Sequence, residues 1–165
     1  FLYSFSPVFH KPAHIKGYLH KDKKTNKVTI SKQEFPDSLP IETAYRPIDS
    51  NGKMTFLEVE LITGRTHQIR AHLAGTGHPL LGDTKYGDNE FNKQYTRHGV
   101  KHQLLHAYRL VIPETDQAFV APVPELFFKI INEEHLQEAY HENLERCMGL
   151  CKNDHHSGAD RNTHK

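Results

Sequence analysis

Two arginines, two histidines and a glutamine fall within residues 64–72, which read Gly-Arg-Thr-His-Gln-Ile-Arg-Ala-His. Arginine is well suited to holding a carboxylate or a phosphate, because its planar fork donates two parallel hydrogen bonds and its charge persists at physiological pH. Arg65 and Arg70, with His67 and Gln68 beside them, therefore predict a pocket or groove for an anionic group. The alternative is that both arginines only solvate the surface of a helix.

The histidines of this motif do not have the spacing of a metal site. A metalloprotease helix carries two histidines four positions apart with a glutamate next to the first. His67 and His72 are five positions apart, which is about 140° around a helix, and Gln68 stands where the acid is needed. We therefore predict no metal here, and none at a second cluster in the polar tail that consists of Cys147, Cys151, His155 and His156.

Other classes of chemistry are excluded by the rest of the sequence. There is no glycine-rich loop for nucleotide phosphates and no Gly-x-Ser-x-Gly turn of a serine hydrolase. A helix-turn-helix DNA reader over residues 66–85 is disfavoured, because Pro79 and Gly82 fall where its recognition helix should begin.

The composition is that of one globular domain with a polar tail. The chain has 165 residues, of which 36% are hydrophobic, and this length suffices for one core. No stretch approaches the roughly twenty apolar residues of a membrane helix, and no signal peptide pattern is present. The two cysteines agree with a reducing compartment. We therefore expect a cytoplasmic protein with no membrane partner.

The charge is distributed unevenly along the chain. Residues 1–109 carry 16 Lys and Arg against 10 Asp and Glu, whereas residues 110–165 carry 5 against 10, so the two parts have net charges of +6 and −5. A basic body indicates a polyanionic partner such as nucleic acid, although an excess of this size also occurs on ordinary solvated surfaces.

The arginine motif directly follows a predicted strand, which positions it. The sequence predicts a strand over residues 54–62, because from Phe56 to Ile62 the apolar Leu57, Val59 and Leu61 alternate with Glu58 and Glu60, the period of a strand with one buried face. The Thr-Gly pair at 63–64 breaks this pattern, and Thr66 is positioned to cap a short helix that ends at Gly75 or Gly77.

The remaining elements are mostly strands. The sequence predicts a hairpin over residues 19–31, strands over 43–48, 104–112 and 118–121, a long surface loop over 83–100, and a helix over about 125–144, followed by a disordered tail over 152–165. This order favours an α+β fold with a mixed, mostly antiparallel sheet and a few short helices.

Three runs of residues together resemble the C-terminal half of the catalytic domain of RluA-type RNA pseudouridine synthases. They are residues 64–70, residues 77–83 (Gly-His-Pro-Leu-Leu-Gly-Asp) with Lys-Tyr-Gly at 85–87, and Leu-His-Ala at 105–107. The resemblance covers about residues 1–128 and fades beyond about Ile131. It implies the pseudouridine synthase fold, truncated at its N-terminus, over residues 1–131, with a C-terminal helix and tail over 132–165.

Members of this family isomerise selected uridines in structured RNA, such as rRNA or tRNA, without a cofactor or metal. They break the glycosidic bond, turn the uracil and rejoin it through carbon. An aspartate attacks, an aromatic ring stacks on the base, and an arginine pairs with the aspartate.

The resemblance also assigns roles to residues of this chain. Arg70 corresponds to the arginine that pairs with the aspartate, and Ile69 to an apolar packing residue. Phe1 takes the place of the stacking tyrosine, with Tyr3 as the alternative. Arg65 either contacts the phosphate backbone or stabilises the turn. His67 and Gln68 are also expected to bind the substrate.

The catalytic aspartate of the family lies in a His-Arg-Leu-Asp run, and the 165 residues contain no such run. Asp22 imitates it poorly and lies on the hairpin, and Asp83 follows Gly82 in what reads as a turn or cap. We therefore hypothesise a fragment that binds RNA weakly and is inactive alone. The alternative is a non-catalytic RNA-binding or interaction module, and an exposed sheet edge predicts self-association in either case.

Overall fold

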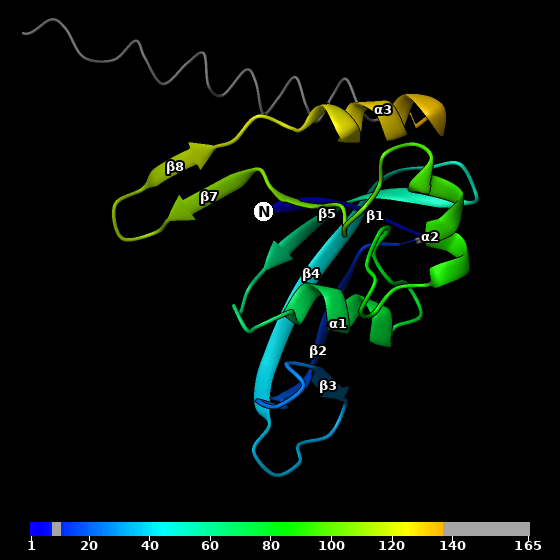
Figure 1. Cartoon of the computed structure of the whole chain (residues 1–165). Coiled ribbons are helices and arrows are strands. Elements are labelled where there is room, and N and C mark those ends of the chain that lie inside the picture. The colour runs from blue at the N-terminus through cyan, green and yellow to red at the C-terminus, as the bar shows by residue number, and fades with distance from the viewer. Residues whose placement is uncertain (8–10, 137–165) are drawn as a thin grey trace, which may run out of the picture.

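The computed structural model describes residues 1–7 and 11–136 and has a six-stranded sheet at its centre (Figure 1). The strand order is β3-β2-β4-β5-β1-β6, and every neighbouring pair is antiparallel. The expected α+β class and mostly antiparallel sheet are confirmed. The strands are β1 (Leu2–Pro7), β2 (Ala13–Lys21), β3 (Val28–Ser31), β4 (Leu39–Ser50), β5 (Met54–Leu61) and β6 (Leu105–Ala107).

Alternation along the central strands gives the sheet two buried faces. On β5, Leu57 and Val59 pack with Ile69 and Leu73 of helix α1 (Gln68–Gly75). Phe56, one position away, belongs to the other core, which helix α3 (Glu125–Glu133) covers. Because successive side chains of a strand point to opposite faces, α1 and α3 lie on opposite sides of the sheet.

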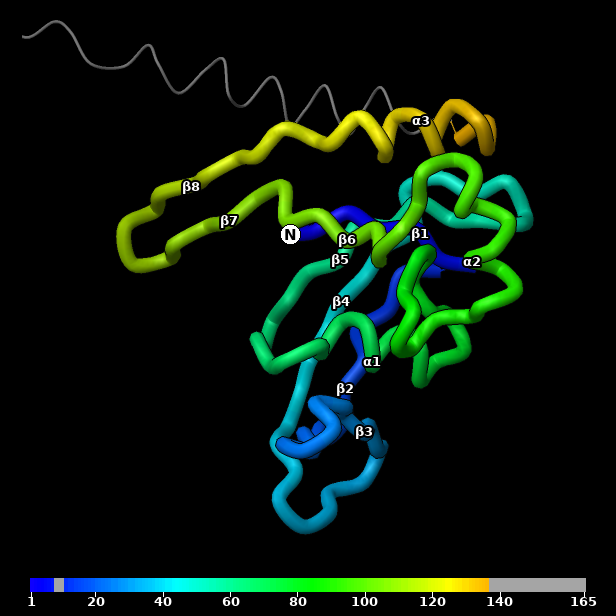
Figure 2. The backbone as a smooth tube through the Cα atoms, viewed as in Figure 1, coloured from blue at the N-terminus to red at the C-terminus, as the bar shows by residue number. Residues whose placement is uncertain are grey.

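The predicted hairpin over 19–31 and the strand from 54 are confirmed by the pairs of β2 with β3 and of β5 with its two neighbours. The strand predicted over 104–112 is instead two strands. Tyr108 interrupts it, because its ring turns into the core and stacks on Tyr3 with centroids 3.9 Å apart. Beyond Tyr108, β7 (Arg109–Ile112) pairs with β8 (Gln117–Val120) in a separate two-stranded sheet, and Figure 2 shows this hairpin extending away from the main sheet.

The loop predicted over 83–100 contains a helix, α2 (Asn89–Thr96). Asp88 caps it by accepting hydrogen bonds from the backbone N–H groups of Glu90 (2.9 Å) and Phe91 (3.0 Å). Tyr95, one turn after Phe91, is buried in the core that α3 covers. The prediction of an irregular loop was therefore wrong, and the cap and this apolar pair explain why.

Helix α3 begins at Glu125 as predicted and ends at Glu133, where His135 follows in the left-handed conformation (φ 53°). Leu136 is still part of the core, so the packed body continues past residue 131. The predicted helical residues after 136, the tail over 152–165 and the cluster around Cys147 lie outside the described residues. Within residues 1–7 and 11–136, no helix is long and apolar enough to cross a membrane.

Candidate functional site

The turn between β5 and α1 is held by the side-chain amide of Gln68. Its Oε1 accepts hydrogen bonds from the Thr63 hydroxyl (2.9 Å) and the Arg65 backbone N–H (3.1 Å). Its Nε2 donates to the Glu42 carbonyl (2.8 Å) and the Thr43 hydroxyl (3.1 Å), both on β4. Gln68 is 2% exposed, and its amide is fully engaged by the chain itself, so the structure gives it a positioning role that sequence analysis did not foresee.

The residue at the N-cap of α1 is His67 and not Thr66, and it makes no side-chain cap. Its backbone is left-handed (φ 55°), which allows the chain to turn sharply out of the strand. The hydroxyl of Tyr86 accepts a hydrogen bond from the Val28 N–H (3.1 Å) and lies 3.1 Å from His67 Nδ1. Burial and the nearby cations, Arg70 foremost, lower the pKa of His67, which favours a neutral ring beside the Tyr86 hydroxyl.

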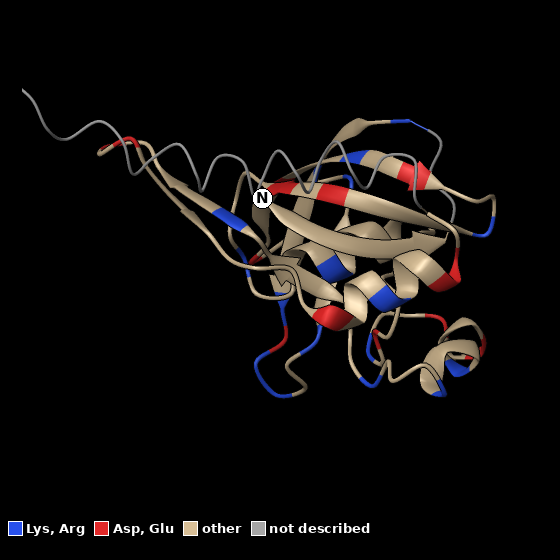
Figure 3. Cartoon of the chain, turned by 90° about the horizontal axis from the view of Figure 1, so that it is seen from above, with Lys and Arg blue, Asp and Glu red and all other residues tan. Residues whose placement is uncertain are grey.

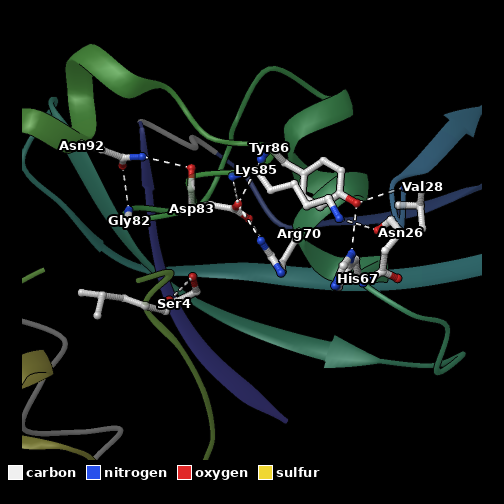
Figure 4. A network of polar contacts seen from close by, with 11 residues as sticks. Ser4, Asn26, Val28, His67, Arg70, Gly82, Asp83, Lys85, Tyr86 and Asn92 are labelled. Atoms are coloured by element: carbon white, nitrogen blue, oxygen red, sulfur yellow. Dashed lines mark hydrogen bonds and ion pairs between the residues drawn. The ribbon is translucent and has the colours of Figure 1, made fainter. Parts of the chain in front are cut away.

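Arg70 forms a two-point ion pair with Asp83 (Figure 4). Nε donates to Oδ2 and Nη2 donates to Oδ1, both at 2.8 Å. The Arg70 side chain is 14% exposed and that of Asp83 is fully buried. Sequence analysis expected Arg70 to pair with a catalytic aspartate that this chain does not contain. Among the described residues the carboxylate that contacts Arg70 is Asp83, which sequence analysis did not identify as its partner.

Asp83 also has the turn role that its sequence context predicted. Its Oδ1 accepts the backbone N–H groups of Lys85 (2.9 Å) and Tyr86 (3.0 Å). Burial acts to raise the pKa of Asp83, but the hydrogen bonds from Arg70 and from these two N–H groups prevail and lower it. The carboxylate is therefore ionised near neutral pH.

The loop that carries Asp83 is fixed to the rest of the fold. Asn92 of α2 donates to the Asp83 carbonyl (3.0 Å) and accepts from the Gly82 N–H (2.7 Å). Gly82 is left-handed (φ 80°), and a Cβ at Gly87 would lie 1.9 Å from the Asp83 carbonyl oxygen. Both glycines are thus needed for the path of this loop.

Arg65 and Arg70 line one pocket of about 420 Å³. Its apolar wall comes from β1, β5, α1 and β6 and consists of Leu2, Leu61, Ile69 and Leu105. The guanidinium of Arg65 is exposed and has no partner among the described residues. An apolar wall with two arginines suits a planar ring that carries an anionic group.

Arg65 also lines a larger pocket of about 830 Å³ at the turn of the β2–β3 hairpin. Lys21, Lys23 and Lys24 line it as well, and none of the three has a carboxylate partner within the described chain. Asp22 lies among them but holds the turn, since its Oδ1 accepts the Lys24 N–H (2.8 Å). Figure 3 shows Lys and Arg interspersed with Asp and Glu elsewhere on the ribbon, so this basic character is local.

Several predicted site residues are not brought to these pockets. Phe1 lies on the α3 side of the sheet, where it lines a separate pocket of about 120 Å³ with Arg46 and Glu58, so strand alternation separates it from Arg70. Tyr3 is fully buried against Tyr108 on that same side. Neither ring, as placed, can stack on a base held beside Arg70.

His72 is buried in the α1 face, with Nδ1 3.1 Å from the Thr43 hydroxyl. Burial lowers its pKa, and it serves the packing of α1 on β4. Ile69 lies both in the core beneath α1 and at the wall of the pocket, which agrees with the packing role expected of it.

A family model described as RNA pseudouridylate synthase matches residues 7–75. The ribosomal large subunit pseudouridine synthase C of Vibrio vulnificus is 36% identical over 110 residues, which are 64% of this chain and 35% of that protein. An uncharacterized RNA pseudouridine synthase of Chloroflexus aurantiacus is 39% identical over 110 residues, covering 64% and 33% respectively. The chain thus spans about a third of the length of the curated relatives it matches.

The fold has a solved counterpart in the structure titled human RNA pseudouridylate synthase domain containing 1. The TM-score is 0.65 at 19% identity, over 89% of this chain and 64% of that chain, a likeness that concerns the fold alone. The sequence match covers the hairpin, the long strands, the turn that contains Arg65 and the helix α1 that carries Arg70. Sequence and fold therefore agree: residues 7–75 match the RNA pseudouridylate synthase model, the chain is similar to bacterial RNA pseudouridine synthases, and its fold is that of a pseudouridylate synthase domain.

Proposed function

We propose that this chain forms the RNA-binding and arginine-bearing part of a pseudouridine synthase site, acting on uridines of structured cytoplasmic rRNA or tRNA. Arg70 would face the catalytic aspartate of the family, which the 165 residues do not supply in a His-Arg-Leu-Asp run. Alone, the chain would bind RNA and leave its uridines unchanged.

The observation that carries this proposal is the position of Arg65, which lines both the 420 Å³ pocket and the 830 Å³ pocket. A nucleotide has an apolar planar base and an anionic phosphate. The smaller pocket offers leucine side chains for the base, and the larger one offers Lys21, Lys23 and Lys24 for phosphates. Arg65, which the two pockets share, would contact the RNA strand between its base and its phosphates.

The RNA-binding half of the proposal is tested by fluorescence anisotropy with a labelled rRNA hairpin at several salt concentrations. Each phosphate contact contributes roughly 0.7 to 0.9 to the slope of log affinity against log salt. Replacing Lys21, Lys23 and Lys24 by alanine should lower the magnitude of that slope by about 2 to 3 if all three bind phosphates. The matched control replaces Lys93, Arg97 and Lys101, exposed cations on and after α2. A flat salt response, or equal loss in both triple variants, would contradict the assignment.

The catalytic half is tested with a chimera. The segment of the Vibrio vulnificus relative that precedes the matched region would be joined to this chain, and pseudouridine would be measured in an rRNA transcript. We expect no product from the 165 residues alone, product from the chimera, and loss of product in its Arg70→Ala variant. If the 165 residues alone formed pseudouridine, the proposal that the catalytic aspartate lies outside them would be refuted.

A non-catalytic RNA-binding module is a second candidate, and one observation favours it. The carboxylate that meets Arg70 in this chain is Asp83, which is buried and held by backbone N–H groups, so Arg70 has a partner without any catalytic aspartate. A chimera that binds RNA with the affinity of the relative, yet forms no pseudouridine, would support the module.

Self-association through a sheet edge remains part of the proposal. The two edge strands of the main sheet are β3 and β6, of four and three residues. Short edges limit pairing with another chain, so we expect any dimer to be weak. Sedimentation velocity over a range of concentrations measures it directly.

A further inference from the structure

The guanidinium of Arg70 is gripped along one of its edges only. Asp83 accepts hydrogen bonds from the Nε–H group and from one N–H of Nη2. A guanidinium carries five N–H groups, so three remain, two on Nη1 and one on Nη2. Within the described part of the chain these three have no partner. Because Arg70 lines the 420 Å³ pocket, a second planar anion can be bound there without breaking the first pair.

The carboxylate that grips Arg70 is itself fixed in orientation. Two consecutive backbone groups, the N–H of Lys85 and that of Tyr86, bind its Oδ1. The side-chain amide of Asn92 accepts from the Gly82 N–H and donates to the Asp83 carbonyl. The Asp83 carboxylate is therefore held in one orientation by backbone groups, unlike a carboxylate in an exposed surface ion pair.

The ring of Tyr86 limits the remaining freedom of Arg70. The guanidinium carbon lies 5.3 Å from the ring centroid, within the range of a cation–π contact. The same ring carries the hydroxyl that meets Val28 and His67. The arginine is thus held along one edge by a carboxylate and lies over the ring of Tyr86.

We propose that Asp83 is a positioning residue, which fixes the guanidinium of Arg70 so that its free edge faces the pocket before any RNA or catalytic aspartate arrives. This inference rests on the proposed function, in which Arg70 acts at that pocket. The physical gain is preorganisation: the rotamer freedom of a long side chain is lost on folding and not on binding.

The variant that tests this is Asp83→Asn, which keeps an oxygen for the Lys85 and Tyr86 N–H groups but removes the charge. Removing a negative charge near a polyanion would by itself strengthen RNA binding. Positioning predicts the opposite, a loss of about tenfold in affinity for the rRNA hairpin, within the range measured for coupled neighbours. Asp88→Asn is the matched control, because it removes a charge from the same loop at a residue that does not contact Arg70.

A double-mutant cycle separates positioning from a general structural effect. If Asp83 acts through Arg70, Asp83→Asn should cause no further loss of RNA affinity in the Arg70→Ala background. An equal tenfold loss in both backgrounds, or a gain in affinity with Arg70 intact, would overturn the proposal.

The state of Arg70 can also be observed without RNA. In the full chain labelled with ¹⁵N, the Arg70 Nε–H resonance should be resolved and exchange slowly with water, and in Asp83→Asn it should exchange rapidly while backbone resonances of β2 and β4 stay in place. If Asp83→Asn does not fold, Asn92→Ala, which leaves the carboxylate but loosens its loop, should speed the same exchange. An unchanged Arg70 signal refutes the positioning role, whereas failure of the wild-type chain to bind RNA refutes the proposed function and leaves this readout valid.

Discussion

Replacing Gln68 by glutamate should make the stability of the fold depend on pH in a way that can be calculated from its hydrogen bonds. The substitution preserves shape and leaves Oε1 able to accept from Thr63 and Arg65. It replaces Nε2, which donates to the Glu42 carbonyl at 2.8 Å, by a second oxygen. Two acceptors would then face each other in a buried site unless the new carboxyl is protonated.

The cost of that protonation sets an upper limit on the effect. An unfolded glutamate has a pKa of about 4.3, and keeping it protonated costs about 1.4 kcal/mol for every pH unit above that value. The folded-state pKa would be raised, so the protons bound by the folded state exceed those of the unfolded state and stability falls as pH rises. The limit is about 1 kcal/mol at pH 5, about 2.3 at pH 6 and about 3.7 at pH 7.

Urea denaturation followed by far-ultraviolet circular dichroism at these pH values gives the free energies of unfolding of both proteins. The difference between wild type and Gln68→Glu at each pH cancels the titration of all other groups. Gln103→Glu is the control, because Gln103 lines the same 420 Å³ pocket and the variant makes the same change of charge. We expect its difference to stay nearly constant with pH.

A difference for Gln68→Glu that is below about 1 kcal/mol at pH 7, or that does not grow with pH, would refute the argument. It would mean that the amide is not committed to β4 and is available to a ligand. In that case Gln68→Glu should change the affinity for RNA and leave the free energy of unfolding nearly unchanged.

Three further predictions concern stability and use the same denaturation assay. Gly87→Ala should destabilise the fold by about 3 kcal/mol or more, because its Cβ would lie 1.9 Å from the Asp83 carbonyl oxygen and relief requires a backbone shift; a loss below about 1 kcal/mol would contradict the close approach. Asp88→Ala should cost about 1 kcal/mol through loss of the α2 cap, and Asp88→Asn, which can still cap, should cost much less. His72 has a lowered pKa because it is buried, so the unfolded state binds its proton first and stability should fall as pH drops below about 6.5; His72→Gln should remove part of that slope between pH 7.5 and 5.5, and an unchanged slope would exclude His72 as its source.

Local patterns predicted the elements whose stability is mostly local. The alternation between Phe56 and Ile62 and the polar turn between residues 19 and 31 indicated strands that the structure contains. The position of Tyr108 was not predictable in the same way, because the break between β6 and β7 depends on a ring stacked on Tyr3, more than a hundred residues earlier.

A signal for α2 was available in the sequence but was outweighed by the polar composition around it. Asp88 is a good capping residue, and Phe91 and Tyr95 have the spacing of one helical turn. The pair of Arg70 with Asp83 was only half predictable. The arginine indicated an anionic partner, but which carboxylate reaches it depends on how the loop after α1 folds back, and that path is set by Asn92 and two glycines.

The left-handed backbone at His67 restricts which amino acids this position can accept in any relative with the same turn. The conformation costs an ordinary L-residue roughly 1 to 2 kcal/mol, so glycine or asparagine would relax the backbone, and valine or isoleucine would be excluded by their branched Cβ. The His67 ring also reaches the Tyr86 hydroxyl, at 3.1 Å from Nδ1, which a purely apolar side chain could not replace by a hydrogen bond. Recurrence of histidine here among homologues would thus reflect the geometry of a turn, and would not by itself identify a residue that touches RNA.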